Sequence, residues 1–368
     1  MNILIFSWRG PGHPNFGGAE LVTHEHAKAW VKKGHKVTLF TSSFKGAKEK
    51  EKIDGVKIIR KSSEFIGVHF HAFFWYLFFQ HPKYDLVIDH FHGIPFFTPL
   101  YVRVKKLAFI HEAAKEVWFL NYNFLIAIIG YYLEPFIFKL FYRKIAFLTV
   151  SPSTKSDLVN WGIPKKNINV IFNGVDMENL PSRLPPKEKA PTLIFLGALT
   201  KDKGIEDALK VYSHLVGYDP SWKLWIVGKG EESYVKKIWS LASNLGILQN
   251  IVFWGFVDEK KKFELLAKAH ILINPSALEG WGLVNIEANL VGTPVVGYDV
   301  AGVRDSVVNG KTGLLVSKGD YIKMAQSAVK LVANEKRYRR YQKHALKWAK
   351  KFSWKSSTKK SLELIENI

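Results

Sequence analysis

The chain of 368 residues lacks cysteine altogether, has only 3 methionines, and carries far fewer acidic than basic side chains. Without cysteine it can form no disulfide and no thiolate nucleophile, which is compatible with a reducing cytosol. Low-complexity tracts and short-period repeats are also missing, so a repeat architecture is not expected. Residues 1–6 have no basic leader and no small-residue cleavage site, and they predict a first strand rather than a signal peptide.

The shortage of acidic side chains leaves a net charge of +21, from 53 Lys and Arg against 32 Asp and Glu. Both halves of the chain are basic, so the charge does not come from a tail. Such a charge has three explanations: a nucleic-acid partner, an anionic membrane surface, or solubility alone. Because the sequence shows neither an RNP-type aromatic motif nor a helix-turn-helix, we expect no nucleic-acid partner.

Two stretches, 65–79 and 124–142, are rich in apolar side chains, and residues 65–147 hold 25 of the 52 Phe, Trp and Tyr. The first stretch is too short to span a membrane, and the second is broken by Glu134-Pro135 with Lys139 following, so neither predicts a spanning helix. Short apolar runs usually form buried core. The neighbouring lysines also allow a surface whose aromatic rings enter the headgroups of anionic lipid, and we favour this peripheral contact.

Apolar β-rich runs alternate with helical patterns along the chain, which is the signature of parallel α/β sheets. A hydrophobic content of 47% is enough for two domain cores in a chain of this length. The predicted strands are 3–6, 37–41, 56–59, 85–89, 107–111, 147–150 and 169–172 in the first half, and 192–196, 224–227, 251–254, 271–274, 295–298 and 313–316 in the second.

A proline-rich segment, 179–191, separates the two sets of strands and is the best linker candidate. It leaves an N-terminal Rossmann-like domain in 1–178 and a C-terminal one in 192–350. Two doubly wound α/β domains joined in this way would place a ligand-binding cleft between the carboxyl ends of their strands.

Two glutamates, Glu279 and Glu287, enclose a loop between a predicted strand and a helix expected over 283–291. Small residues and unpaired N–H groups at the start of a helix form an anion cradle. One carboxylate can bind a neutral polyol beside that cradle, and the other can bind a ribose diol. The pattern therefore suits a nucleotide-sugar, although an ordinary βα turn with two solvated acids has the same spacing.

The residues around this loop resemble the retaining glycosyltransferases of family 4, the group 1 glycosyltransferases. The resemblance covers nearly the whole chain, in order. Its motifs are Gly17-Gly18-Ala19-Glu20, Gly34-His35-Lys36-Val37, Ile110-His111-Glu112, Val150-Ser151, Asn173-Gly174-Val175-Asp176, Phe195-Leu196-Gly197 with Lys203-Gly204, Ile226-Val227-Gly228-Lys229-Gly230, Val252-Phe253-Trp254-Gly255-Phe256, Gly292-Thr293-Pro294-Val295-Val296 and Asn309-Gly310-Lys311-Thr312-Gly313-Leu314-Leu315-Val316.

The resemblance implies the GT-B fold, with residues 351–368 forming a helix that packs back on the N-terminal domain. It also implies two catalytic residues, His111 beside the donor sugar and Glu279 at the sugar hydroxyls. Glu287 would bind the ribose diol and Lys203 the diphosphate. The remaining donor-binding residues are Gly17, Gly18, Val257, Gly280, Trp281, Gly282, Leu283 and Val284.

One position departs from the family pattern. An arginine usually follows the glycine of Phe195-Leu196-Gly197, but Ala198 stands there, which puts diphosphate binding in doubt, and Lys201 is a possible substitute. GT-B enzymes need no bound metal, so we expect none. The four histidines at 69, 71, 90 and 92 alternate as zinc ligands can, but packing explains them better.

We therefore expect a cytoplasmic, membrane-peripheral hexosyltransferase that uses a UDP- or GDP-sugar and retains the anomeric configuration. Its acceptor would be a lipid-linked sugar or a glycan precursor. A sugar-nucleotide epimerase or a soluble disaccharide synthase shares this fold, because fold does not fix the reaction. A non-catalytic donor-binding protein and a basic nucleic-acid-binding protein are the alternatives outside enzymes.

Overall fold

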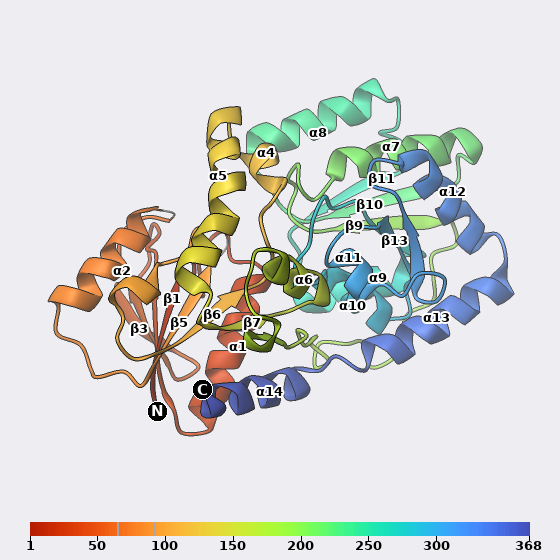
Figure 1. Ribbon diagram of the computed structural model, residues 1–368. Helices are drawn as coiled ribbons and strands as arrows, with labels where there is room; N and C mark the ends of the chain where they lie inside the picture. Colours follow the sequence, from red (N-terminus) through yellow and green to blue (C-terminus); the bar gives the residue numbers. More distant parts are fainter. Residues whose placement is uncertain (65, 92) are drawn as a thin grey trace. The chain divides into compact units, whose positions relative to one another are not determined.

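The computed structural model describes residues 1–64, 66–91 and 93–368, which form two compact units (Figure 1). Unit 1 comprises Met1–Gly174 and Trp354–Ile368, and unit 2 comprises Val175–Ser353. Each unit contains one mainly parallel sheet with helices packed on it, as the alternating sequence pattern predicts.

The sheet of unit 1 has the strand order β3-β4-β2-β1-β5-β6-β7-β8, and all its pairs are parallel except β3 with β4. Its strands are β1 (Asn2–Ser7), β2 (Lys36–Thr41), β3 (Lys50–Ile53), β4 (Val56–Arg60), β5 (Leu86–Phe91), β6 (Lys105–Ile110), β7 (Ala146–Thr149) and β8 (Ile168–Val170). Its helices are α1 (Gly18–Lys32), α2 (Ile66–Phe78), α3 (Thr98–Tyr101), α4 (Val117–Asn121), α5 (Phe124–Ile137), the π-helix η1 (Phe138–Tyr142), α6 (Pro152–Asn160), the 3₁₀ turn η2 (Lys165–Asn167) and α14 (Trp354–Asn367).

The chain of unit 1 reverses its direction across the sheet between β1 and β5. From β1 it moves through α1 to β2, whereas from β5 it moves through β6 and β7 to β8. Right-handed crossovers then place α1 on one face and α2, α3, α5, η1 and α6 on the other. Two core clusters underlie this second face: one joins α2 and α3 to β1, and the other joins η1 and α6 to β6 and β7.

The sheet of unit 2 has the order β11-β10-β9-β12-β13-β14 and is entirely parallel, with its own reversal between β9 and β12. Its strands are β9 (Thr192–Leu196), β10 (Lys223–Val227), β11 (Ile251–Gly255), β12 (Ile271–Asn274), β13 (Val295–Tyr298) and β14 (Gly313–Val316). Its helices are α7 (Ile205–Tyr218), α8 (Glu232–Asn244), α9 (Glu259–Lys268), α10 (Leu283–Leu290), α11 (Val303–Ser306), α12 (Tyr321–Val332) and α13 (Glu335–Ala349).

The sequence predicted every strand of the two parallel sheets to within three residues, but not β3. This strand, with the sequence Lys-Glu-Lys-Ile, is too polar for a buried-strand pattern and pairs antiparallel with β4 at the sheet edge. Asp54 and Gly55 connect the two strands, both with positive φ (49° and 83°). An Asp-Gly pair is a strong hairpin signal, and it would have revealed the strand.

The expected break at Glu134-Pro135 does not occur. α5 runs through Pro135 and continues as η1, so 124–142 is one uninterrupted helix that is long and apolar enough to cross a membrane by length and composition alone. Proline removes one helical N–H, and the wider π turn that follows absorbs the mismatch. Glu134 does not disturb the helix either, because its carboxylate is buried and receives two hydrogen bonds from the loop after β6 and one from Trp118 of α4.

The proline-rich segment 179–191 belongs to unit 2, and the division between the units lies at Gly174 instead. Lys187 anchors the segment, because its Nζ donates to the carbonyl oxygen of Ala269 (2.6 Å) and to Thr293 Oγ1 (2.7 Å). At the other end of the chain, α14 packs on α1 within unit 1. His26 and Trp30 of α1 bond to the hydroxyls of Ser357 (3.0 Å) and Ser361 (3.1 Å).

Candidate functional site

The reversal point of the sheet in unit 2 brings two predicted site residues into contact. Lys203 follows β9 and Glu279 follows β12, which are neighbours in the sheet, so both lie at its carboxyl edge. Lys203 Nζ lies 3.0 Å from Glu279 Oε1, and Ser276 Oγ donates to the same oxygen at 2.9 Å. Glu279 Oε2 has no hydrogen-bond partner among the described residues. Open α/β sheets bind their ligands at such a point.

The backbone of Glu279 is fixed by a close approach of two loops. Its N–H donates to the carbonyl oxygen of Ala301 at 3.1 Å. Gly302 has a φ of 75°, and a Cβ at this position would lie 2.0 Å from the Glu279 carbonyl oxygen. Only glycine satisfies both the positive φ and the contact, so the loop after β13 sets the position of the carboxylate.

The second glutamate, Glu287, lies in α10 and makes a separate ion pair. Its Oε1 lies 2.8 Å from Nζ of Lys262 in α9, and Lys262 also contacts Glu259 at 2.7 Å. Burial raises the pKa of Glu287, and the Lys262 ammonium opposes that shift. Glu287 therefore keeps one oxygen bound to lysine, while Oε2 has no partner in the described part of the chain.

Of the residues between the two glutamates, some present backbone amides at the start of α10, and one, Trp281, has its side chain in the core. Gly282 is the N-cap of α10 with a φ of 71°, and within the described chain the amides of Leu283 and Val284 donate to no group. Gly280 lies in the loop before them. The side chain of Trp281 is only 2% exposed and packs edge-on against Phe352.

The other predicted positions of unit 2 lie at the ends of β9, β10 and β11. Val257 is half-buried in the turn between β11 and α9. Ala198 is exposed after β9, and no contact in the described structure joins Lys201 to Lys203 or Glu279. Lys229, which follows β10, extends over the ring of Phe256 beside Val257, with its Nζ 5.6 Å from the ring centroid.

In unit 1, His111 meets two aromatic residues that the sequence analysis did not connect with it. Its ring lies 5.1 Å from that of His90 and 4.4 Å from that of Phe109, measured between centroids. His90 Nδ1 lies 2.8 Å from Ser7 Oγ. Ser7, His90 and His111 lie at the carboxyl ends of the adjacent strands β1, β5 and β6, where the chain reverses. His111 is buried, and its carbonyl oxygen accepts a hydrogen bond from Thr154 Oγ1 at 3.0 Å.

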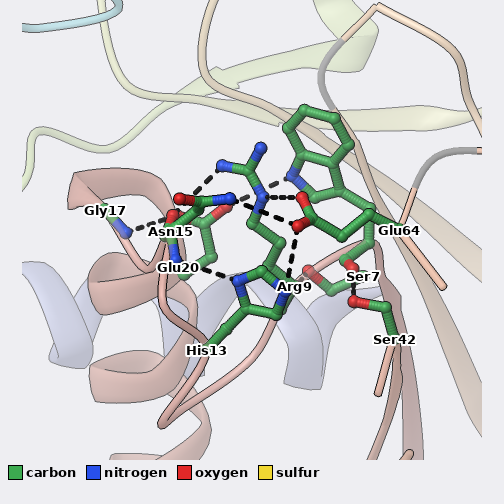
Figure 2. Close-up of polar contacts among 9 residues, drawn as sticks. Ser7, Arg9, His13, Asn15, Gly17, Glu20, Ser42 and Glu64 are labelled. Carbon is green, nitrogen blue, oxygen red and sulfur yellow. Dashed lines mark hydrogen bonds and ion pairs between the residues drawn. The ribbon is translucent and has the colours of Figure 1, made fainter. Parts of the chain in front are cut away.

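The glycine pair Gly17-Gly18 opens α1, but one of its amides already has an acceptor. Gly17 N–H donates to Glu20 Oε2 at 2.9 Å, and Trp8 Nε1 donates to Glu20 Oε1 at 3.2 Å (Figure 2). The carboxylate of Glu20 thus occupies part of the place where an anion would bind at this helix start. A phosphate here would have to displace Glu20.

The loop between β1 and α1 is held by a network around Glu64 (Figure 2). Glu64 Oε2 lies 2.6 Å from Arg9 Nε, and its Oε1 lies 3.1 Å from His13 Nε2 and 3.2 Å from Asn15 Nδ2. The Arg9 guanidinium stacks over the Trp8 ring at 4.2 Å. Burial lowers the pKa of His13, although Glu64 opposes the shift. These contacts hold the loop that precedes Gly17 in a single conformation.

The histidine pairs make ordinary contacts. His69 and His71 lie in α2, not in an extended segment, and bond to the carbonyl oxygens of Ile94 (3.0 Å) and Gly67 (3.1 Å). His90 bonds to Ser7, and His92 lies outside the described residues. Among the residues that the structure describes, no three His, Cys, Asp or Glu side chains form a group that could hold a metal ion.

Sequence reasoning missed Lys262, Ser276 and Ser7, and it considered His90 only as a candidate zinc ligand. Lys262 had a weak signal, because it lies five residues after the predicted donor-binding residue Val257, in the first turn of a helix whose N-cap is Asp258. Ser276 follows the predicted strand 271–274 by two residues, and its contact depends on the side-chain conformation of Glu279. Ser7 and His90 are 83 residues apart in the chain, and only the pairing of β1 with β5 brings them together.

Comparisons with known proteins agree with this architecture. The family described as glycosyltransferase family 4 matches residues 16–179, and the family described as glycosyl transferases group 1 matches residues 176–348. N-acetyl-alpha-D-glucosaminyl L-malate synthase from Bacillus anthracis is 26% identical over 89% of this chain and 87% of its own length.

Two solved structures share the whole fold. Sucrose-phosphate synthase from Thermosynechococcus elongatus matches with a TM-score of 0.84 and 19% identity, over 100% of this chain and 98% of that one. Anabaena HepE in complex with UDP-glucose matches with a TM-score of 0.78 and 16% identity, over 100% of both chains. With the two family matches and the GT-B fold of its two Rossmann-like units, the chain belongs to the group 1, family 4 glycosyltransferases.

Proposed function

We propose that this glycosyltransferase moves a hexose from a nucleoside-diphosphate sugar to a hydroxyl of a lipid-linked sugar or glycan precursor at a membrane surface, with retention of the anomeric configuration. The observation that carries the proposal is the contact of Lys203 with Glu279 at the reversal point of unit 2. A structural neighbour was solved with UDP-glucose, which supports a UDP-sugar as the first donor to test.

The charges of unit 2 suit a donor with a diphosphate and several hydroxyls. Lys203 and the free amides at the start of α10 supply positive potential for the diphosphate. Glu279 and Glu287 each bind a lysine through one carboxylate oxygen, and the other oxygen can accept a hydrogen bond from a hydroxyl of the donor. We assign Glu279 to the sugar hydroxyls and Glu287 to the ribose diol.

In the proposed reaction the bond between the anomeric carbon and the phosphate oxygen breaks, and its electron pair leaves with the nucleoside diphosphate. The acceptor oxygen bonds to the anomeric carbon on the same face. Its proton passes to the departing phosphate, so no side-chain nucleophile is needed. Lys203 and the α10 amides stabilise the charge that develops on the phosphate, a form of electrostatic catalysis that needs no metal. His111 serves as a contact to the donor sugar.

The direct test measures nucleoside-diphosphate release from UDP- and GDP-sugars, with and without a membrane lipid extract. We expect lipid-stimulated release from one donor, unchanged by EDTA. Glu287→Gln and Lys203→Met should each reduce kcat/KM at least 100-fold, because each removes a charged contact to the donor. Glu259→Gln and Lys210→Met are the matched controls. Glu259 is the more exposed partner of Lys262, and Lys210 pairs with Asp207 on the surface of α7.

The anomeric configuration of the product, measured by NMR coupling constants, tests retention. Inversion would refute the proposed mechanism while leaving the donor site intact. Donor binding by calorimetry without any release would favour a non-catalytic binding protein. Conversion of the donor to an epimer without an acceptor would favour an epimerase. Release stimulated by soluble sugars and not by lipid would assign a soluble acceptor.

A further inference from the structure

The helix that runs from Phe124 to Tyr142, α5 with η1, uses only a narrow stripe to pack on unit 1. Its buried side chains are Ala127, Glu134, Phe138 and Tyr142, whose spacing of 7, 4 and 4 residues keeps them on one side of the helix. Only 22% of the most apolar 18-residue window is buried. The exposed side chains around the rest of the helix are the apolar residues Phe124, Leu125, Ile126, Ile129, Tyr132, Leu133, Phe136 and Leu140, together with Lys139 near its C-terminal end.

A second apolar stripe lies on the same face of the sheet. The exposed side chains of α2 and the residue after it are Phe70, Phe74, Leu77, Phe78 and Phe79, together with His71. α3 joins the two helices. Phe73 of α2 packs on Tyr101 at 4.9 Å between ring centroids, and Phe97 packs on Phe141 of η1 at 6.0 Å. The outward residues of α5 and of α2 are called the apolar face below; α5 is the yellow helix and α2 the orange one in Figure 1.

Ordinary surface helices carry charged side chains outward, and this face does not. Residues 117–138 contain one charged side chain, Glu134, and it points into unit 1. Exposed apolar side chains gathered on two helices of the same sheet face mark an interaction site.

Basic side chains gather where the apolar helix ends. Residues 135–168 contain six Lys and Arg, and their only acid is Asp157, which is buried and paired with Lys115. Lys139, Arg143 and Lys144 are exposed at the end of η1. Asn167 Nδ2 donates to the Arg143 carbonyl oxygen at 3.1 Å, which places the exposed pair Lys165-Lys166 beside them. These five exposed cations are called the basic cluster.

The helix is attached to unit 1 at Glu134 and Gly130. Glu134 accepts hydrogen bonds from the amides of Ala114 (2.9 Å) and Lys115 (3.2 Å) and from Trp118 Nε1 (3.1 Å). Gly130 provides the room for the Trp118 indole, since a Cβ at Gly130 would lie 2.4 Å from the ring. A helix held in this way can lie in the interface with its free side in lipid.

We propose that the apolar face and the basic cluster form a surface that docks unit 1 onto a bilayer containing anionic lipid. The aromatic and aliphatic side chains enter the headgroup region, and the five cations meet lipid phosphates. Charge complementarity selects this occupant, because the acid of the described segment 135–168, Asp157, is already paired with Lys115, and a basic cluster of this kind attracts an anionic surface. The inference rests on the proposed function in one respect only: docking brings unit 1 to a lipid-linked acceptor.

The loop that carries His111 is joined to this surface. The segment 113–118 follows His111 directly and is bound to α5 through Glu134 and Trp118. Docking of α5 therefore positions the loop at the carboxyl end of β6, where His111 meets His90 and Ser7. The surface and the predicted catalytic histidine are thus connected within unit 1 through the hydrogen bonds of Glu134.

Sedimentation of the full chain with vesicles tests the proposal. We expect binding to vesicles of phosphatidylcholine with phosphatidylglycerol, weaker binding in high salt, and little binding to phosphatidylcholine alone. Leu125→Glu should reduce the partition coefficient at least tenfold. Tyr218→Glu is the matched control, because both side chains are 74% exposed and Tyr218 lies on α7 of unit 2. Arg143→Glu and Lys144→Glu should each reduce binding to anionic vesicles about fivefold or more, since a basic residue near such a surface contributes about that factor.

Three outcomes would overturn the docking surface. The wild-type chain could remain in the supernatant with anionic vesicles, Leu125→Glu could bind as well as the wild type, or the chain could form a dimer that Leu125→Glu dissociates. Thermal unfolding and UDP binding measured on each variant show whether it is folded. Vesicle binding without diphosphate release would retain the surface and refute the proposed function. Diphosphate release without vesicle binding would retain the glycosyl transfer and refute the docking surface.

Discussion

The pKa of a side chain in this enzyme depends on its surroundings, and Glu134 is the clearest case. Burial raises the pKa of Glu134 from 4.5 to about 7, and the three hydrogen-bond donors only partly oppose this shift. Its carboxylate therefore changes charge within the pH range of ordinary assays, at the junction between α5 and the His111 loop.

The pKa of Glu134 predicts a pH dependence of stability with a definite sign. Between pH 4.5 and 7 the folded state binds this proton more tightly than the unfolded chain does, so the contribution is fully present below pH 4.5 and is lost as the pH rises through 7. The loss is on the order of 3 kcal/mol. Urea unfolding at pH 5 and pH 8 should show it for the wild type, and Glu134→Gln should remove most of the difference. The exposed neighbour variant Glu116→Gln should behave as the wild type, and equal pH dependence in all three proteins would contradict the assignment.

Lys262 is the residue on which Glu287 depends. Replacement with Met leaves a buried carboxylate without its counter-ion, which costs about 3 kcal/mol or more when a buried pair is broken. We expect a lower urea midpoint and a weaker donor affinity for Lys262→Met, with Lys262→Arg restoring much of both. Lys261→Met is the control, because Lys261 pairs with the more exposed Glu264. Unchanged donor affinity in Lys262→Met would show that Glu287 acts without lysine.

Among the elements, α5 shows how tertiary contacts override intrinsic preference. Alanine is a better helix former than glycine by about 1 kcal/mol. Gly130 and Gly217 both lie inside helices, and a Cβ at Gly130 meets the Trp118 ring while a Cβ at Gly217 meets nothing within 4 Å. We expect Gly217→Ala to raise the melting temperature and Gly130→Ala to lower it. Stabilisation by both substitutions would mean that Trp118 moves aside freely.

The same element accounts for a wrong prediction. Glu134-Pro135 looked like an interruption because both residues are unfavourable inside an apolar helix. The helix tolerates them since the loop after β6 and Trp118 of α4 together supply three donors to Glu134, and a π turn follows the proline. No local pattern contains those donors, which lie 16 to 20 residues away along the chain.

At the scale of the whole molecule, the packing of the C-terminal helix α14 predicts which unit a mutation in that helix destabilises. Ile365 of α14 is buried in unit 1 although it follows all of unit 2 in the sequence. Ile365→Ala should destabilise unit 1 by about 2–4 kcal/mol through the cavity that it leaves. Calorimetry with and without UDP should show a shift in the transition that the nucleotide does not stabilise. A shift of the UDP-stabilised transition instead would place the effect in unit 2.

The sequence by itself determined the two α/β sheets, the order of their elements, the strand-to-helix loop that carries Glu279 and the helix that carries Glu287. It could do so because strand runs, helix periods and glycine-proline turns are local signals. Only the tertiary structure decided that Lys203 contacts Glu279, that Lys262 holds Glu287 and that Ser7, His90 and His111 meet, since these contacts depend on which strands pair. It also decided that the most apolar helix lies largely exposed, because exposure depends on what packs against a helix and not on its composition.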